Sequence, residues 1–286
     1  MHNKESFIEL GARQRAKAIL DSGSFREILG PFDGVESPWL EPQGIVPQSD
    51  DGMVIAKGTI QGKDTVVVAI EGSFQGGSMG EVSGAKMAAA IDLAAEDCLA
   101  GKPTIVVLCL ETGGVRLQEA NLGLASIADI HAAIVRAREV APVIGVIAGT
   151  VGCFGGMSIA AALCSYLVVT KEARLGLNGP QVIEQEAGIR EYNSKDKPFI
   201  WQMTGGEVRS RCGFVDKLVK DDVPEIRKAG AECAEKGVPE HFRTGCIDYR
   251  TGCIDYFLEK LSVYDTAEQA QPGTAEKLYE GGFKHD

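Results

Sequence analysis

The sequence predicts an α/β fold built on a mainly parallel sheet with helices on both faces. Short apolar runs rich in β-branched residues alternate with longer Ala-rich segments, and glycine clusters stand where several of the short runs end. Such runs are typical of strands whose two faces are both covered by helices. With 286 residues, 44% of them hydrophobic, the chain is long enough to bury a core of this kind.

The first fifty residues show little regular pattern. Apolar positions between residues 6 and 29 are interrupted at Asp21-Ser22-Gly23, which predicts two short helices. The next segment, residues 30–52, has few periodic positions and contains Pro31, Pro38, Pro42 and Pro47. We therefore expect residues 1–50 to form N-terminal helices followed by an extended loop.

A regular alternation begins at residue 51. Two strand-like runs, Met53–Gln61 and Asp64–Glu71, flank a Gly-Lys turn and predict a β-hairpin. Further strands are expected at Thr104–Glu111, Val143–Ala148 and Tyr166–Thr170, and helices at Ser83–Ala100, Leu122–Val140, Ser158–Ser165 and Pro198–Gly205. We assign residues 51–240 to one domain.

The C-terminal tail, residues 241–286, contains a tandem repeat. The seven residues RTGCIDY at 243–249 recur at once at 250–256. Seven residues make nearly two helical turns, so on a helix the second copy would leave the downstream face almost unchanged. We interpret the repeat as a neutral duplication or a sequence artefact.

Charge and composition exclude several classes of protein. The net charge of −11 and the pI near 5.0 argue against nucleic acid or anionic membrane as a partner. The first thirty residues are charged throughout and carry no secretory signal, so we expect a cytoplasmic protein. The eight cysteines include no C-x-x-C pair, and we expect reduced structural thiols and no metal site.

Three glycine-rich turns are the strongest functional signal. They lie at Gly76–Gly80, Thr112–Arg116 and Gly152–Met157, each between a strand-like run and a helical one. Glycine there permits positive φ and lets a ligand approach bare N–H groups. The spacing fits neither the Rossmann fingerprint nor a P-loop. Two such turns in neighbouring βα units can instead aim two N–H groups at one oxygen, as in an oxyanion hole.

These turns resemble, in order and spacing, the N-terminal half of acyl-CoA carboxyltransferases. The similar strings are GSFQGGSMGEVSGAKM from Gly72, TGGVRLQEA from Thr112 and GTVGCFGG from Gly149, within a resemblance that covers about residues 50–220. Within that superfamily, the string LNGPQVIEQEAG from Leu177 resembles the β subunit of malonate decarboxylase. The zinc ribbon of the bacterial acetyl-CoA carboxylase β subunit is missing, which disfavours that relative.

The resemblance implies a crotonase-like ββα superhelix that pairs with a homologous γ subunit. It also implies a malonyl thioester presented on the phosphopantetheine-like arm of an acyl carrier protein, an acyl-carrier transferase subunit, and no cofactor bound directly. The oxyanion hole is then expected at Gly155 and Gly156, with the other backbone donor at Gly113 and Gly114. Residues expected to bind substrate are Val115, Arg116, Gln118, Cys153, Phe154 and Met157.

Loss of CO₂ from a malonyl thioester places negative charge on the thioester oxygen, which main-chain donors can stabilise. Three alternatives stay open: transfer of the carboxyl group to biotin, an enoyl-CoA hydratase or isomerase, and a non-catalytic scaffold. A hydratase needs a glutamate near the second turn, but no carboxylate lies between Gly149 and Val169. His131 is expected to be structural or solvent-facing, and Cys153 has no basic neighbour in sequence to make it a thiolate.

Overall fold

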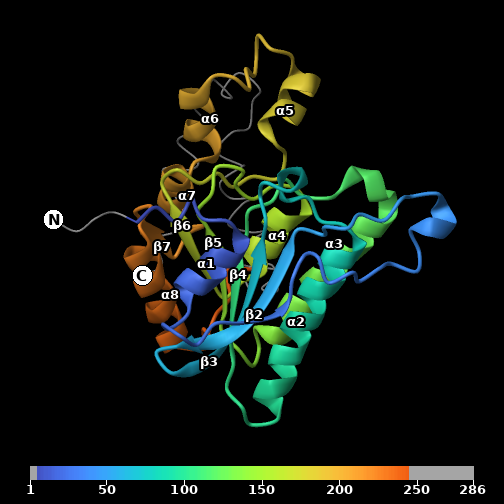
Figure 1. The fold of residues 1–286 in the computed structure, drawn as a ribbon. Coiled ribbons are helices and arrows are strands. Elements are labelled where there is room, and N and C mark those ends of the chain that lie inside the picture. The colour runs from blue at the N-terminus through green and yellow to red at the C-terminus, as the bar shows by residue number, and fades with distance from the viewer. Residues whose placement is uncertain (1–4, 245–286) are drawn as a thin grey trace, which may run out of the picture.

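A seven-stranded sheet forms the centre of the structure, a computed structural model that describes residues 5–244 (Figure 1). The strands lie side by side in chain order. β1, β2 and β3 are antiparallel, and every later neighbour is parallel. The strands are β1 Arg26–Leu29, β2 Met53–Ile60, β3 Lys63–Ile70, β4 Ile105–Cys109, β5 Val143–Ile147, β6 Tyr166–Thr170 and β7 Lys217–Val219. The predicted hairpin and the mainly parallel sheet are confirmed.

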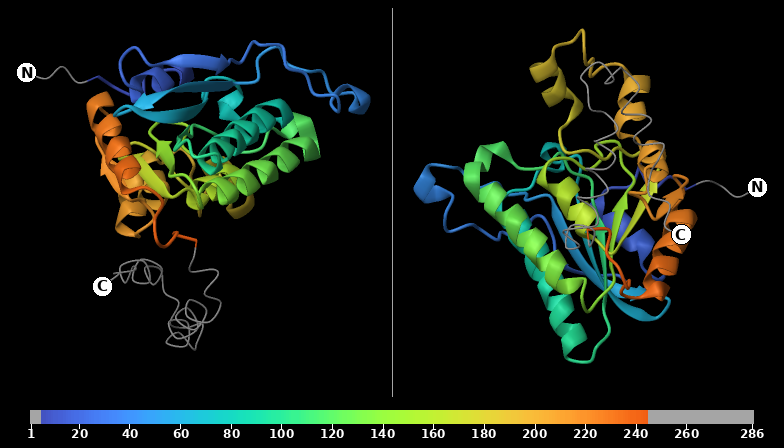
Figure 2. Two further views of the ribbon diagram at one scale, coloured as in Figure 1. Left: turned by 90° about the horizontal axis from the view of Figure 1, so that it is seen from below. Right: turned by 180° about the vertical axis from the view of Figure 1, so that it is seen from behind.

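Helices cover both faces of this sheet, as the view from below in Figure 2 shows. The α-helices are α1 Ala12–Ile19, α2 Glu81–Leu99, α3 Ala120–Ala137, α4 Gly156–Leu163, α5 Pro180–Ala187, α6 Lys197–Thr204, α7 Gly206–Arg211 and α8 Val223–Lys236. Short 3-10 turns lie at η1 Glu41–Gln43, η2 Gln75–Gly77 and η3 Leu117–Glu119. The four helices expected between residues 51 and 240 are all present, within a few residues of the predicted ends.

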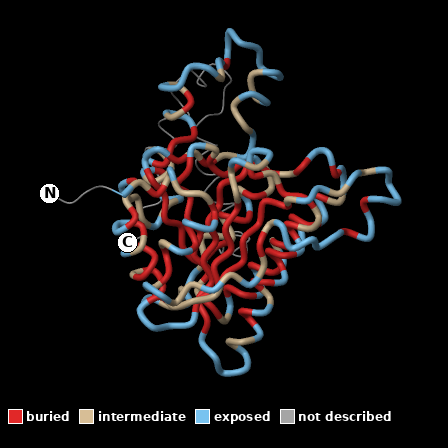
Figure 3. The backbone as a smooth tube through the Cα atoms, in the orientation of Figure 1, coloured by how far each residue is buried: buried red, intermediate tan, exposed pale blue. Residues whose placement is uncertain are grey.

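Two apolar layers, one on each face, hold the sheet between the helices. Val66 and Val68 of β3 pack into the layer formed with α2, α3 and α4. Val67 and Ala69 of the same strand pack into the layer formed with α1 and α8. Successive side chains of a strand point to opposite faces, so a strand buried on both faces must be apolar throughout. Figure 3 shows the resulting buried centre, with exposed backbone at the periphery.

A second, smaller ladder repeats along the chain next to the main sheet. Isolated parallel bridges join Met79 to Val115, Thr112 to Cys153, and Cys153 to Leu175. Each of these segments follows a main strand, and the first three precede α2, α3 and α4. The repeating unit is thus a long strand, a short extended segment and a helix, which is the expected ββα arrangement. All three glycine-rich turns lie in these short segments.

The N-terminal prediction was wrong in one element. The second of the two helices expected before residue 30 is strand β1, which pairs with β2 through Arg26 opposite Lys57 and Glu27 opposite Ala56. Its residues alternate between exposed and half-buried, which is the period of an edge strand. Four residues are too few to show that period against a helical one. Of the tandem repeat, only Arg243 and Thr244 lie within the described residues, and the prediction for the repeat concerns residues beyond them.

Candidate active site

Two of the glycine turns meet at the carboxyl ends of β4 and β5: Thr112–Arg116, the first turn below, and Gly152–Met157, the second turn. The bridge between Thr112 and Cys153 joins them. A Cβ atom on Gly155 would lie 3.1 Å from the Gly114 Cα atom, so backbone packs directly on backbone. Both residues have positive φ, +107° at Gly114 and +61° at Gly155. Only glycine combines this conformation with such a close approach.

The glycines themselves use most of their N–H groups to hold this geometry. Gly113 donates to the Gly76 carbonyl at 2.9 Å, and Gly155 donates to the Leu177 carbonyl at 2.7 Å. Gly114 donates to the Thr112 hydroxyl at 3.1 Å. These three amides are therefore already engaged, and the open donors lie elsewhere.

Open N–H groups lie directly after the first glycine pair, on Val115, and at the end of the second pair, on Gly156 itself and on Met157. Within residues 5–244, the amides of Val115, Gly156 and Met157 have no hydrogen-bond acceptor. Gly156 and Met157 are the first two residues of α4, whose N–H groups have no partner within the helix. A helix N-terminus also carries partial positive charge, which favours an anion.

The Val115 amide points toward the second turn. The Gly114 carbonyl accepts from Met79 N–H, and Arg116 N–H donates to the Met79 carbonyl, both at 2.8 Å. In a strand, the groups flanking a residue point opposite to its own N–H, so that of Val115 faces away from Met79. A Cβ on Gly155 would lie 3.8 Å from the Val115 nitrogen. Open donors from two ββα units thus face a common region.

Arg116, expected to bind substrate, is buried in a network instead. Its guanidinium pairs with Glu119 at 3.0 Å and donates to the carbonyls of Ser78 at 2.9 Å and Asp51 at 3.2 Å. The Phe74 ring lies 5.3 Å from it. With 3% of its surface exposed, Arg116 fixes the first turn to the loop before α2.

Of the other residues expected to bind substrate, some are buried in the core and some are exposed. Cys153 and Met157 are fully buried and Phe154 is 3% exposed, whereas Gln118 in η3 is exposed. The Cys153 thiol donates to the Met157 carbonyl at 3.2 Å. Burial raises its pKa well above the ordinary value, so the thiol stays protonated and is no nucleophile. The side chains of Cys153 and Met157 therefore belong to the core on which the second turn packs.

A buried ion pair that the sequence did not reveal joins the two turns. The Glu111 carboxylate, directly before the first turn, pairs with Arg15 of α1 and accepts Val151 N–H at 2.7 Å from the second turn. Arg15 also donates to the Phe7 carbonyl at 3.3 Å and to that of Ile8 at 2.9 Å. Because the ionic partners are 96 residues apart, no local pattern could have indicated the pair.

Arg174 also supports the second turn, through contacts with the loop that precedes it. Its guanidinium lies 5.5 Å from the Phe154 ring and 5.0 Å from the Trp201 ring. It donates to the Thr150 carbonyl at 2.6 Å and to that of Val151 at 3.2 Å. Burial lowers its pKa, and among residues 5–244 its Nε has no hydrogen-bond partner. The guanidinium thus lies near two aromatic rings and holds the loop before Gly155 through hydrogen bonds.

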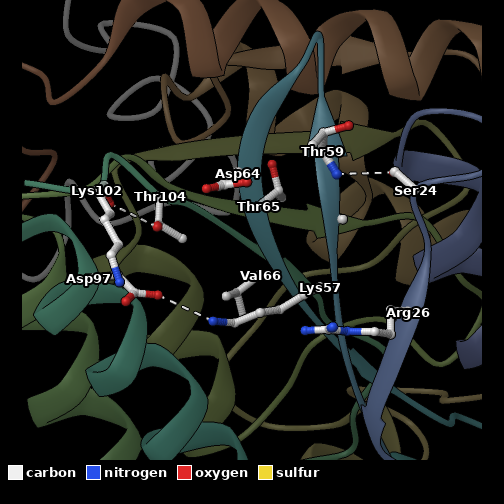
Figure 4. A pocket seen from close by; sticks show the side chains of 11 residues that line it. Ser24, Arg26, Lys57, Thr59, Asp64, Thr65, Val66, Asp97, Lys102 and Thr104 are labelled. Carbon is white, nitrogen blue, oxygen red and sulfur yellow. Dashed lines mark hydrogen bonds and ion pairs between the residues drawn. The ribbon is translucent and has the colours of Figure 1, made fainter.

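A separate cavity of 480 Å³ lies at the opposite end of β2 and β3 (Figure 4). Charges of both signs line it: Arg26, Lys57, Asp64, Asp97 and Lys102. Lys57 pairs with Asp97 at 3.2 Å. Ligand sites of parallel sheets lie at the carboxyl ends of the strands, and no predicted site residue lines this cavity. The glycine turns therefore remain the candidate site.

Neither a metal centre nor a membrane span is found in the described part of the chain. Between residues 5 and 244, no cluster of three or more His, Cys, Asp or Glu side chains could hold a metal ion. No helix in the same range is long and apolar enough to cross a bilayer.

The fold is of the crotonase type, and its glycine turns between strand and helix bring open backbone amides together. The carboxyl transferase domain family matches residues 9–230, and the chain belongs to this family. The carboxyltransferase resemblance of the sequence motifs is thereby confirmed.

Three relatives narrow the comparison. Malonyl-S-ACP:biotin-protein carboxyltransferase MADC of Malonomonas rubra is 41% identical over 82% of this chain and 77% of its own length. A Pseudomonas malonate decarboxylase hetero-tetramer, crystallised with malonate, contains a chain 60% identical, with a TM-score of 0.83 and 94% of both chains covered. The Pseudomonas malonate decarboxylase MdcD-MdcE hetero-dimer matches at 55% identity and a TM-score of 0.71, covering 86% of this chain and 95% of that one.

Proposed function

We propose that this chain is the β subunit of a malonate decarboxylase and that it stabilises the enolate formed when a malonyl thioester loses CO₂. The observation that carries the proposal is the convergence of open amides, Val115 from the first turn and Gly156 and Met157 from the second. The 60% identity to a chain of the Pseudomonas malonate decarboxylase supports this substrate class.

The reaction makes one specific demand on the protein. The bond between the carboxylate carbon and the α carbon breaks, its electron pair moves into the thioester enolate, and CO₂ leaves. A proton then adds to the α carbon, giving the acetyl thioester. Because the negative charge on the thioester oxygen grows along this path, fixed N–H donors stabilise the transition state more than the substrate. Removing one such donor typically costs about 10²–10³-fold in rate.

The electrostatics of the site fit this main-chain mechanism. Three ionisable side chains within or directly before the turns, Glu111, Arg116 and Cys153, are buried, and each is engaged in holding the backbone. A second turn without a carboxylate argues against a hydratase, which needs a general acid and base there. The amides at the N-terminus of α4 are thus the groups best placed to meet a developing anion.

Exposed apolar side chains on the elements around the site support pairing with a homologous γ subunit. Leu124 and Val135 of α3 are 54% and 39% exposed, and Ile159 of α4 is 46% exposed. Leu177 and Val182 add further exposed apolar surface near the second turn, at 60% and 47%. Exposed apolar surface that a partner covers is typical of a protein interface. The substrate is then presented on the phosphopantetheine-like arm of an acyl carrier protein, which an acyl-carrier transferase subunit loads.

The experiment compares the isolated chain with the β–γ complex, using malonyl-carrier protein as the substrate. We expect CO₂ and acetyl-carrier protein from the complex and little turnover from the chain alone, because half of a two-part site cannot hold all reacting groups. Full turnover by a verified monomer would refute the two-subunit site. A folded, complete complex that releases no CO₂ would refute the decarboxylase.

Transfer of the carboxyl group to biotin is the second candidate, favoured by the 41% identity to the biotin-protein carboxyltransferase of Malonomonas rubra. Adding avidin to the same assay separates the two reactions. Avidin abolishes turnover if biotin must accept the carboxyl group, and it has no effect if CO₂ is released directly.

A further inference from the structure

His131 makes one hydrogen bond, and that bond reaches the candidate site. Its Nε2 atom lies 2.7 Å from the carbonyl oxygen of Gly156, the first residue of α4. A carbonyl only accepts, so Nε2 carries the proton and donates. The imidazole is half-buried on α3, and no other hydrogen bond of it is found between residues 5 and 244.

The accepting carbonyl belongs to the same peptide group as an open donor. The Gly156 carbonyl and the Met157 N–H are the two ends of one planar amide. Donation to the oxygen of an amide polarises the group and makes its N–H a stronger donor, by about 10–30% per bond. The imidazole therefore acts on an amide that has no acceptor of its own in the described structure.

We propose that His131 is a positioning residue for decarboxylation: it orients and polarises the peptide between Gly156 and Met157 so that its N–H meets the enolate oxygen. This inference rests on the proposed function, because it assigns a support to the same donors. His131 does not touch the thioester and acts through the backbone.

The bond is not needed to satisfy the carbonyl. In a regular helix, the carbonyl of the first residue accepts the N–H four residues on, which in α4 is that of Ala160. The packing of α3 on α4 at this point is also made by another residue, since a Cβ on Gly156 would lie 2.7 Å from Ile127 Cγ2. Loss of the imidazole thus leaves the fold intact while removing the polarisation.

The test compares three variants of the β–γ complex, chosen for where they place a donor. His131→Gln puts an amide N–H near the position of Nε2, His131→Asn puts it one carbon shorter, and His131→Phe keeps a ring without a donor. We expect kcat on malonyl-carrier protein to fall about 3- to 10-fold in the Asn and Phe variants. The Gln variant should retain most of the rate, and KM should change less than twofold in all three.

A structural role would not produce this pattern. Unchanged kcat in both the Asn and Phe variants, or a loss that Gln does not rescue, would overturn the role of His131. So would an effect confined to KM, since a transition-state interaction changes kcat. Replacing the Met157 N–H itself separates this from the proposed function. If that change slows decarboxylation while the His131 variants are active, the donors stand and only the support is wrong; if it does not, the proposed function fails.

Discussion

The two glycine turns look alike in sequence but differ in what they leave open. In the first turn, the N–H groups of Gly113 and Gly114 both donate to acceptors within the protein, and buried Arg116 fixes the segment through its ion pair with Glu119. In the second, Gly155 donates to Leu177, but the helix begins at once and leaves the amides of Gly156 and Met157 open. One turn offers a single donor, and the other offers a helix N-terminus.

The difference shows what the glycines are for. At Gly114 and Gly155 they allow positive φ and the contact of two backbones, because a Cβ on Gly155 would lie 3.1 Å from Gly114 Cα. The residues that follow them present the free N–H groups. A glycine pair in such a turn therefore marks a close approach, and the donors lie on its second glycine or on the residue directly after it.

The largest effect is expected where the two turns are tied together. Glu111→Gln leaves Arg15 as an unpaired buried charge, and breaking a buried pair typically costs about 3–5 kcal/mol. Urea unfolding of the single variants and of the double variant Arg15→Met/Glu111→Gln measures the coupling. We expect the double variant to recover part of the loss. Additive single effects would show that Arg15 and Glu111 are not coupled.

The next prediction distinguishes the effect of close packing between the two turns from the effect of backbone strain at a glycine with positive φ. Gly155→Ala and Gly114→Ala each place a methyl group between the turns and should lower kcat by about 10²-fold through displaced donors. Gly62→Ala is the matched control, because Gly62 has φ of +75° in the hairpin turn with open space around it. The control should lose stability by about 1 kcal/mol and keep its rate. Equal rate losses in all three variants would contradict the assignment.

The smallest effect is expected at Asp21, beside the same hairpin turn. Hydrogen bonds from Gly62 N–H at 2.9 Å and the Thr59 hydroxyl at 2.7 Å lower its pKa from 3.8 to about 2. A lowered pKa stabilises the fold above the unfolded value and loses that contribution as the pH falls from 3.8 toward about 2. Asp21→Asn should cost less than about 1 kcal/mol at pH 7 and leave kcat unchanged. A stability difference that persists at pH 2 would contradict this origin.

Most of the scaffold could be predicted from the sequence because its signals are local. The hairpin and helices α2, α3 and α4 follow from periodicity and from the glycines between them. β1 could not be predicted, since its four residues form a strand only by pairing with β2. Helix α5 was also missed, because its eight residues are largely exposed and carry little apolar pattern.

The sequence indicated the two turns of the candidate site, and the remainder of the site depends on contacts distant in sequence. The motifs placed the two turns, but which amides are open depends on acceptors such as Gly76 and Leu177. Arg116 follows a glycine turn like a ligand-binding residue, yet Asp51 and Ser78 surround it. The bond of His131 to Gly156 spans 25 residues and two helices, so its sequence position gave no indication of it.

One measurement tests the backbone donors most directly. Replacing Met157 by its α-hydroxy analogue turns the amide between Gly156 and Met157 into an ester and removes one N–H while keeping the side chain. The same change at Ser158 is the control, because that N–H already donates to Gly155 at 3.0 Å. We predict that the ester at 157 lowers the kcat of the β–γ complex on malonyl-carrier protein by about 10²-fold, with carrier affinity kept. A rate at 157 equal to that of the control would contradict stabilisation of the enolate by the α4 amides.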